Sequence, residues 1–185
     1  MRVWVVLALI VAAMAVGVVL YRANYAKNDA SQGSMGETTG AAGARKFPKA
    51  PEFVLPDEFG KLQGLEALRG DVILIHFWAS WCPPCVGELP KIIKSANAYK
   101  DKKFKLVVIS LDKNWKDADR VLPNGKLPPN VFSLLDSANK VSAAYGSYEF
   151  PETYLLTRDL RIVTKWIGPQ KWNSEEFKSL FGRMF

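Results

Sequence analysis

Apolar and polar residues follow a strand, helix and strand pattern through the middle of the chain. The run "DVILIHFWA" at 71–79 is almost wholly apolar and rich in aromatic and β-branched residues, which is typical of a strand buried on both faces. A second such run, "FKLVVISLD" at 104–112, follows a stretch with a helical pattern at 84–100. This order predicts a βαβ unit with a right-handed crossover, and the first strand is expected near the centre of a sheet.

Beyond this unit the pattern is shorter and more interrupted. The segment 115–130 predicts a short helix and then a loop rich in turn residues, and the residues assign it no task. "VFSLLD" at 131–136 has the composition of a short strand. The stretch 137–146 predicts a helix with Ser137 as its N-cap and Gly146 as its end.

The C-terminal part of the pattern predicts a hairpin and a final helix. Two apolar runs within 152–168 are joined at "TRDL", and Gly168 and Pro169 end the second run, which indicates an antiparallel pair of strands. A last helix is expected after Asn173 or Ser174, either of which can cap it. The whole order predicts an α/β fold with a mixed central sheet and helices on both faces.

The N-terminal residues differ from the rest in composition. After Arg2 no charged residue occurs until Arg22, and a helix of this length can cross a hydrocarbon core of about 30 Å. Residues 1–22 are therefore predicted to form an uncleaved transmembrane helix, and small residues within the run leave a cleaved signal peptide as the alternative. Small and polar residues at 23–47 predict a flexible linker. Both alternatives deliver a domain of residues 48–185 across a membrane.

The net charge of +7 does not point to nucleic acid. Five basic and two acidic residues fall within residues 1–47, and the other basic residues are spread along the chain. A nucleic-acid surface would require them to gather into a patch or stripe. The chain has 185 residues, of which 49% are hydrophobic, so it can bury one ordinary core. One domain with N-terminal appendages is therefore expected.

Two cysteines and one histidine limit the chemistry open to the chain. A closed structural zinc site needs about four ligands, usually cysteine or histidine, and the sequence offers only Cys82, Cys85 and His76. A long-range structural disulfide is excluded because there is no third cysteine. What remains is a pair of thiols that cycles with its own disulfide. This chemistry requires no cofactor and no metal.

The position of the pair between a strand and a helix indicates a role for each sulfur. Cys82 is expected at the helix N-terminus, where backbone N–H groups and the helix dipole stabilise a thiolate, so it is predicted to be the nucleophile. Cys85, one turn into the helix, is predicted to be the shielded resolving thiol. Pro83 and Pro84 suit the first helical turn and stiffen the loop that sets the redox balance.

These residues carry a resemblance to a known family. "WCPPC" after "ILIHFWAS", with Pro90 five residues past the second cysteine, resembles the thioredoxin fold. Residues 50–92 resemble the opening, and residues 148–169 the closing half, of membrane-anchored, extracytoplasmic thioredoxin-like reductases of the TlpA/ResA type. These are related to the CcmG/DsbE reductases of cytochrome c biogenesis. The resemblance covers residues 48–185, and the segment 115–130 falls where this family carries an extra helix and strand.

The resemblance implies a substrate groove beside the dithiol. Pro151 would be the cis-proline that faces the dithiol, and the peptide before it would pair with the backbone of a substrate. From the sequence alone, an ordinary trans-proline at the start of a strand is the alternative. Phe150 would flank the groove, where it either selects substrates or merely packs. Trp81, Pro83 and Pro84 would form part of the surface that contacts the substrate.

Two further residues are candidates for proton transfer. The resemblance implies that Glu88, three residues past Cys85, shuttles protons during exchange, and a solvated helical glutamate is the alternative. His76 stands where the family commonly has an asparagine and thioredoxins have a buried aspartate. It is expected beneath the active site, where it could accept the proton of Cys85. The alternative for His76 is a buried neutral side chain that is hydrogen-bonded to the backbone.

The resemblance implies a thiol-disulfide oxidoreductase that keeps protein cysteines reduced. Its clients would be proteins with a cysteine pair, such as apocytochrome c or the copper site of a respiratory oxidase. A membrane protein of the DsbD/CcdA type would supply electrons. The chain would be a single-pass protein of a bacterial cell membrane, with its catalytic domain in the periplasm or extracytoplasmic space. Two alternatives stay open, namely an oxidant that donates disulfides from the same fold and a copper(I)-handling protein.

Overall fold

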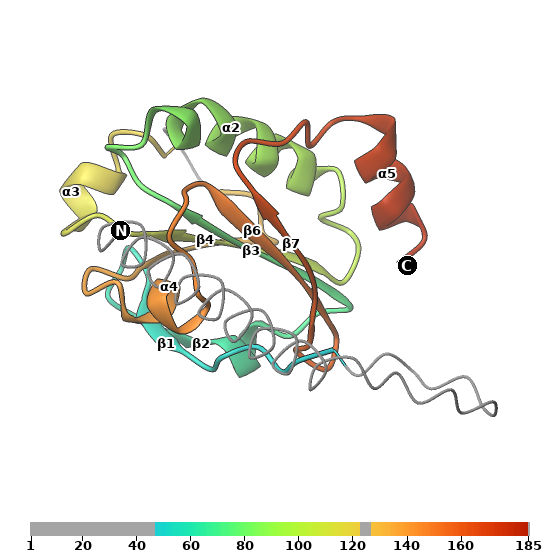
Figure 1. The fold of residues 1–185 in the computed structure, drawn as a ribbon, viewed down its shortest axis with the longest axis horizontal. Coiled ribbons are helices and arrows are strands. Elements are labelled where there is room, and N and C mark those ends of the chain that lie inside the picture. The colour runs from blue at the N-terminus through green and yellow to red at the C-terminus, as the bar shows by residue number, and fades with distance from the viewer. Residues whose placement is uncertain (1–46, 123–126, 185) are drawn as a thin grey trace, which may run out of the picture. The chain divides into compact units, whose positions relative to one another are not determined.

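A five-stranded mixed sheet organises the protein, of which this computed structural model describes residues 47–122 and 127–184. The strands are β3 (Val72–Trp78), β4 (Phe104–Ser110), β5 (Val131–Leu135), β6 (Glu152–Thr157) and β7 (Ile162–Ile167). They lie in the order β5-β4-β3-β6-β7 (Figure 1). β3 runs parallel to β4 and antiparallel to β6, and β6 pairs with β7 as an antiparallel hairpin. The predicted strand, helix and strand unit, the central position of its first strand and the closing hairpin are confirmed.

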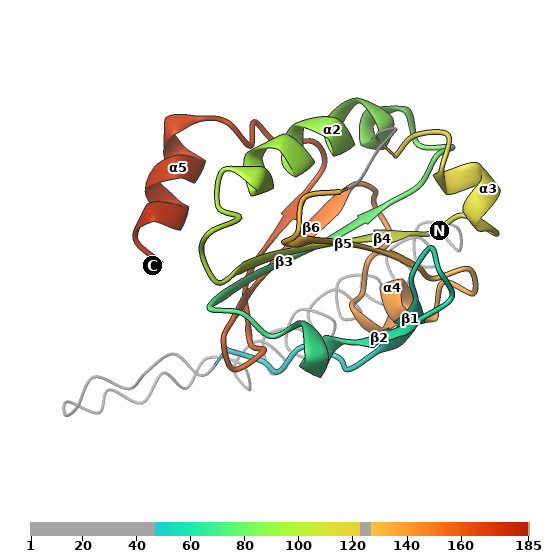
Figure 2. The ribbon, with the colours of Figure 1, turned by 180° about the vertical axis from the view of Figure 1, so that it is seen from behind.

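Helices and a small two-stranded hairpin cover both faces of this sheet. They are α2 (Pro83–Asn97), α5 (Glu175–Gly182), α4 (Lys140–Ala144), β1 (Val54–Pro56), β2 (Leu62–Gly64) and the 3-10 turn η1 (Leu65–Leu68). Figures 1 and 2 show α2 and α5 on one face, and α4 with the β1–β2 hairpin on the other. Because both faces are covered, all seven residues of β3 are buried. This explains why its apolar run is continuous rather than alternating.

Aromatic side chains fill the core on both sides of the sheet. On the face that carries α4, the Phe77 ring meets those of Tyr145 and Tyr154 edge to face, at centroid distances of 5.4 and 5.9 Å. On the opposite face, Trp172 lies against Trp166, with centroids 5.7 Å apart. Such pairs add about 0.5–1.5 kcal/mol each to the burial of their area. The second cluster also fixes the position of Trp172, which bears on the active site.

The helix α4 differs from the prediction for residues 137–146. It spans only Lys140–Ala144, and Ser137 does not cap it, so that part of the prediction was wrong. The N-cap residue is Asn139, whose side chain makes no capping hydrogen bond. The carboxylate of Asp136 takes that role, because it accepts hydrogen bonds from three backbone N–H groups of the helix at 2.9 to 3.0 Å. Gly146 ends the region as predicted, with a left-handed φ of 64° that favours glycine.

The other predicted helices are present. α2 begins at Pro83, one residue before the predicted start at residue 84, and it ends at Asn97, three residues before the predicted end at residue 100. Ser174 caps α5, since its hydroxyl accepts a hydrogen bond from the backbone N–H of Phe177 at 3.4 Å. The helix expected in the segment 115–130 is α3 (Trp115–Ala118).

Several N-terminal predictions concern residues outside the described part. These are the transmembrane helix at 1–22 and, apart from its last residue, the linker at 23–47. Within residues 47–122 and 127–184, no helix has both the length and the apolar character that a membrane crossing requires.

Candidate active site

The two cysteines lie where β3 leads into α2, and they are joined as a disulfide with an S–S distance of 2.05 Å. Cys82 is the N-cap of α2, and the backbone nitrogen of Cys85 is 3.3 Å from its sulfur. Cys82 is 6% exposed, whereas Cys85 is completely buried. In the reduced protein, the helix N-terminus would therefore stabilise a thiolate at Cys82, and Cys85 would be shielded behind it.

Asp112 holds the turn that precedes Cys82. Its carboxylate accepts hydrogen bonds from the backbone N–H of Ser80 at 3.0 Å and from the hydroxyl groups of Ser80 and Ser110 at 2.7 Å. Asp112 is buried, so these bonds form in a low-dielectric environment, where they are strong. Asp112 was not predicted, because in the sequence it is only the polar end of an apolar run. The signal that could have found it is its place at the end of the strand next to β3.

Phe150 and Pro151 lie directly against the dithiol. The peptide bond between them is cis, as the resemblance implies, and the carbonyl oxygen of Phe150 is 3.6 Å from Cys82 Sγ. The carbonyl oxygen of Pro151 accepts a hydrogen bond of 2.8 Å from the backbone N–H of Gly168, at the end of β7. Pro151 therefore lies next to the cysteines, as expected, and its hydrogen bond to Gly168 attaches it to the end of β7.

Apolar side chains that are at least partly exposed lie on the segments that adjoin Cys82 and Pro151, and together they are called the apolar rim. It consists of Trp81, Tyr148, Phe150 and Ile167. Trp81 is 62% exposed and meets the partly buried Phe150 ring edge to face, with centroids 6.2 Å apart. Tyr148 is 73% exposed, and Ile167, which pairs with the residue after Pro151, is 52% exposed. Tyr148 and Ile167 were not predicted, because they lie far from the cysteines in the sequence.

Pro83 and Pro84 occupy the first turn of α2, as expected, and both are exposed beside Cys82. Proline has no backbone N–H group, and N–H groups in the first turn of a helix have no hydrogen-bond partner within the helix. The two prolines therefore cost the helix no internal hydrogen bond. Their exposed rings extend the surface available to a substrate.

Glu152 organises the loop that carries Phe150. Its buried carboxylate accepts hydrogen bonds from the hydroxyl group of Ser147 and from the backbone N–H of Glu149, the latter at 3.1 Å. It also forms a salt bridge of 2.8 Å with Lys165 on β7. Burial alone would raise the pKa of Glu152, but the hydrogen bonds from Lys165 and Ser147 outweigh it and hold the pKa below its ordinary value. Glu152 therefore remains ionised and ties the loop to the sheet.

Glu88 is buried rather than solvated, so that alternative is wrong. Its Oε1 accepts hydrogen bonds from the backbone N–H of Gln170, at 2.7 Å, and from the indole N–H of Trp172. Its Oε2 has no hydrogen-bond partner among the described residues. Burial raises the pKa of Glu88, and the two donors and Lys91 offset only part of this effect. Gln170 and Trp172 were not predicted, because the sequence of the segment that joins β7 to α5 has no motif that distinguishes it from an ordinary loop.

His76 lies in the middle of β3 and is completely buried. Its Nδ1 is 2.8 Å from the hydroxyl oxygen of Thr153, the residue opposite it on β6, so the expected hydrogen bond to the backbone was wrong. Burial lowers the pKa of His76 to about 3. A neutral imidazole with so low a pKa is a poor acceptor of protons near neutral pH.

Within residues 47–122 and 127–184, no three histidine, cysteine, aspartate or glutamate side chains are grouped so that they could hold a metal ion. The sequence profile of the redoxin family matches residues 46–181 of the chain. The chain belongs to the redoxin family.

Similar proteins of known class support the same chemistry for this redoxin. It is 28% identical over 170 residues to the thiol-disulfide oxidoreductase ResA of Bacillus thuringiensis, across 89% of this chain and 87% of that protein. It is 33% identical over 153 residues to the thiol:disulfide interchange protein DsbE of Allochromatium vinosum, across 75% of this chain and 80% of that one. The solved structure of StoA from Bacillus subtilis matches with a TM-score of 0.58 and 27% identity, across 71% of this chain and 97% of that chain.

The fold, the dithiol and these relatives agree. The redoxin has a thioredoxin-like α/β fold with a mixed central sheet, and it is a thiol-disulfide oxidoreductase with Cys82 and Cys85 as its cysteine pair.

The burial of His76 predicts a specific dependence of stability on pH. Because its pKa is lowered from 6.5 to about 3, the unfolded chain binds a proton that the folded protein does not. The corresponding stability is present above pH 6.5 and is lost as the pH falls toward 3. Between pH 7 and pH 5, the free energy of unfolding should decrease by about 2 kcal/mol more in the wild-type protein than in His76→Asn.

Urea unfolding of residues 46–185, followed by tryptophan fluorescence at both pH values, measures this difference. Acidic groups titrate alike in the two proteins, so they cancel in the comparison. An identical decrease in the two proteins would mean that folding does not alter the pKa of His76.

Proposed function

We propose that this redoxin reduces disulfides in client proteins on the extracytoplasmic side of a bacterial cell membrane. The observation that carries the proposal is the asymmetry of the dithiol: Cys82 is 6% exposed and adjoins the segments of the apolar rim, whereas Cys85 is completely buried. This arrangement suits a protein substrate, because an extended segment can cover the rim while its sulfur reaches Cys82. The reducing direction is supported by the resemblance to reductases of the TlpA/ResA type.

The reduction would proceed in two exchanges. The Cys82 thiolate attacks one sulfur of the client disulfide, and the other client sulfur leaves as a thiolate and takes up a proton. The thiol of Cys85 then loses its proton, and its sulfur attacks Cys82 Sγ and displaces the second client sulfur, which leaves as a thiolate and also takes up a proton. The client thereby gains two electrons and two protons. The redoxin is left with the Cys82–Cys85 disulfide, the form in which the two sulfurs are found here.

Glu88 accepts the proton of Cys85 in this proposal. It lies three residues after Cys85 on α2, so the two side chains are on neighbouring turns of one helix face. Its raised pKa brings it closer to the neutral range in which a general base is most effective. Its Oε2 is available to take a proton, because no described residue bonds to it. His76 is the weaker base, since its pKa is about 3.

The client class, the electron donor and the location follow from the resemblance. Clients with a cysteine pair, such as apocytochrome c or a copper-site protein, would present the disulfide. A membrane protein of the DsbD/CcdA type would return electrons to Cys82 and Cys85. The uncharged run between Arg2 and Arg22 supports a single membrane anchor, which would keep the domain close to both partners.

The reduction potential tests the direction of this reaction. Residues 46–185, equilibrated with glutathione or dithiothreitol at pH 7, are expected to show a potential of about −250 mV or lower, as thioredoxin-like reductants do. A potential of about −120 mV would instead identify a donor of disulfides and would reject the proposal.

Replacement of Cys85 should trap the client. In Cys85→Ser the first exchange still occurs, but no resolving thiol remains, so the client stays joined to Cys82 as a mixed disulfide. The matched control is Cys82→Ser, which lacks the attacking sulfur and should trap nothing. Electrophoresis without reducing agent, followed by mass spectrometry, detects and names the trapped proteins. Equal yields from the two variants would contradict the assignment of Cys82 as the nucleophile.

Glu88→Gln should slow client reduction at pH 7 by roughly 100-fold, which is a typical contribution of a general base. In the wild-type protein the rate should rise with pH as the carboxylate ionises at its raised pKa, and the variant should lack this rise. Single-turnover rates from pH 4 to pH 8 measure both effects. Glu58→Gln, at an exposed position in the turn between β1 and β2, serves as the control. An unchanged pH profile in Glu88→Gln would remove Glu88 from the mechanism.

A further inference from the structure

A cavity lined by lysines lies between α2, α5 and the segment that joins β7 to α5. Its volume is about 520 Å³. Four lysines contribute to its walls, and they are Lys91, Lys94, Lys171 and Lys178. No aspartate or glutamate of the described residues lines it. The lining therefore carries a net positive charge, and two carboxylates outside it interact with its lysines: Glu175 with Lys178, and the buried Glu88 with Lys91.

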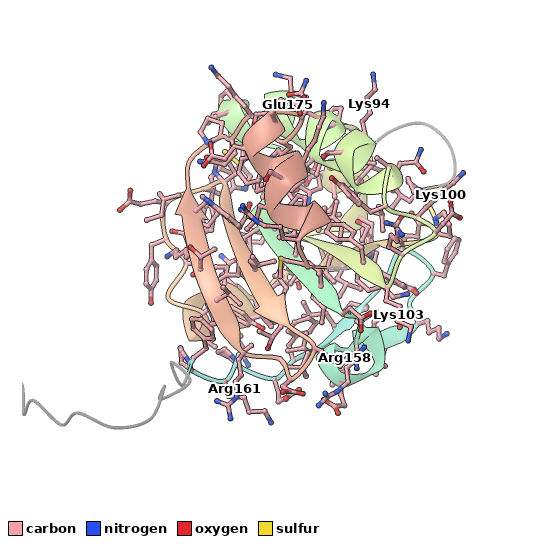
Figure 3. The ribbon with its side chains drawn as sticks, turned by 90° about the vertical axis from the view of Figure 1, so that its right-hand side faces the viewer. Lys94, Lys100, Lys103, Arg158, Arg161 and Glu175 are labelled. Atoms are coloured by element: carbon pink, nitrogen blue, oxygen red, sulfur yellow. A yellow bond between two sulfur atoms is a disulfide. The ribbon has the colours of Figure 1, made fainter. Side chains whose placement is uncertain are left out.

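Among the described residues, three of these four ammonium groups form no salt bridge. Lys178 forms a salt bridge of 2.7 Å with Glu175. Glu175 and Lys94 are both labelled at the upper end of the view in Figure 3. In the part of the chain that the structure describes, Lys91, Lys94 and Lys171 form no salt bridge. Like charges around one space repel each other. An anion placed among them would replace repulsion with attraction.

The walls of the cavity are held in place by contacts that do not involve the lysines. The hydroxyl group of Ser95 on α2 donates a hydrogen bond of 2.8 Å to the carbonyl oxygen of Trp172. Gln170 donates from its backbone to Glu88 at 2.7 Å, and from its side chain to the carbonyl oxygen of Gly168 at 3.0 Å. The segment is thus attached to α2 at two points. A preformed cavity of this kind loses little conformational entropy when it binds a ligand.

We propose that this cavity binds a phosphate-bearing ligand. A phosphate group carries several oxygens and up to two negative charges, so it can contact more than one ammonium group at once. Lysine suits this task as a compact point charge on a flexible stem. The apolar part of such a ligand can rest on Tyr99 and Ala98, which also line the cavity. A soluble phosphate and a lipid headgroup share this chemistry, and the experiment below separates them.

The site adjoins the dithiol machinery but does not depend on it. Lys91 lies one turn beyond Glu88 on α2, and Gln170 and Trp172 both line the cavity and bind Glu88. A ligand would therefore rest on the same segment that holds Glu88. Its binding can be measured without any thiol exchange, so this inference and the proposed redox role can fail separately.

Residue-specific acetylation of the full chain in a nonionic detergent tests the inference. At constant ionic strength, pyrophosphate should reduce the acetylation rates of Lys91, Lys94 and Lys171 at least threefold, as measured by mass spectrometry. Lys116, an exposed lysine on α3, is the internal control and should react at an unchanged rate. The affinity for pyrophosphate, measured by calorimetry, should fall at least tenfold in the double variant Lys94→Gln and Lys171→Gln, and it should be unchanged in Lys116→Gln.

The second arm of the experiment uses the full chain in nanodiscs of phosphatidylcholine, with or without phosphatidylglycerol. Protection of the three lysines by pyrophosphate supports the inference with a soluble ligand. Protection that requires phosphatidylglycerol supports it with a lipid headgroup. Equal protection of Lys116, or no protection in either arm, overturns it.

Discussion

The burial of β3 on both faces is the constraint on which the site depends. A strand of seven buried residues must pair along both of its edges, and it does so with β4 and β6. Because β4 is parallel and β6 antiparallel, the ends of β3 and β4 and the beginning of β6 meet at one edge of the sheet. Phe77 is thereby opposite Glu152, and Trp78 is opposite Ser110. The turn before Cys82 and the loop around Pro151 are brought together by strand pairing alone.

Three buried carboxylates then hold the segments around the site in place. Asp112 holds the turn before Cys82, Glu152 holds the loop before Pro151, and Glu88 binds the segment before α5. Their different environments shift the pKa values of Glu152 and Glu88 in opposite directions. Lys165 and several donors keep Glu152 ionised, whereas burial dominates at Glu88 and raises its pKa. Carboxylates whose pKa values are shifted in opposite directions can serve different tasks: Glu152 supports structure, and Glu88 is left able to exchange a proton.

The sequence was sufficient for the features that repeat a local pattern and insufficient for those that depend on distant partners. The continuous apolar run of β3 and its connection to α2 were predictable, because burial on two faces leaves a clear composition. The place of Cys82 at the start of α2 followed from the same pattern. Asp136, however, replaces Ser137 as the cap of α4, and both are equally suitable in composition. The role of Trp172 required knowing that its segment returns to α2, which no local pattern contains.

The low exposure of Cys82 bears on which disulfides can bind favourably at the site. Only 6% of Cys82 is exposed, so a small disulfide that reaches the sulfur gains few other contacts. A protein segment can also cover Trp81, Tyr148 and Ile167, and each square ångström of apolar surface that it removes from water contributes about 25 cal/mol. Because these contacts lie outside the reacting atoms, they strengthen binding of the client without altering the sulfur chemistry. In the proposed reaction, the dithiol would therefore set the chemistry, and the rim would favour disulfides carried by protein segments.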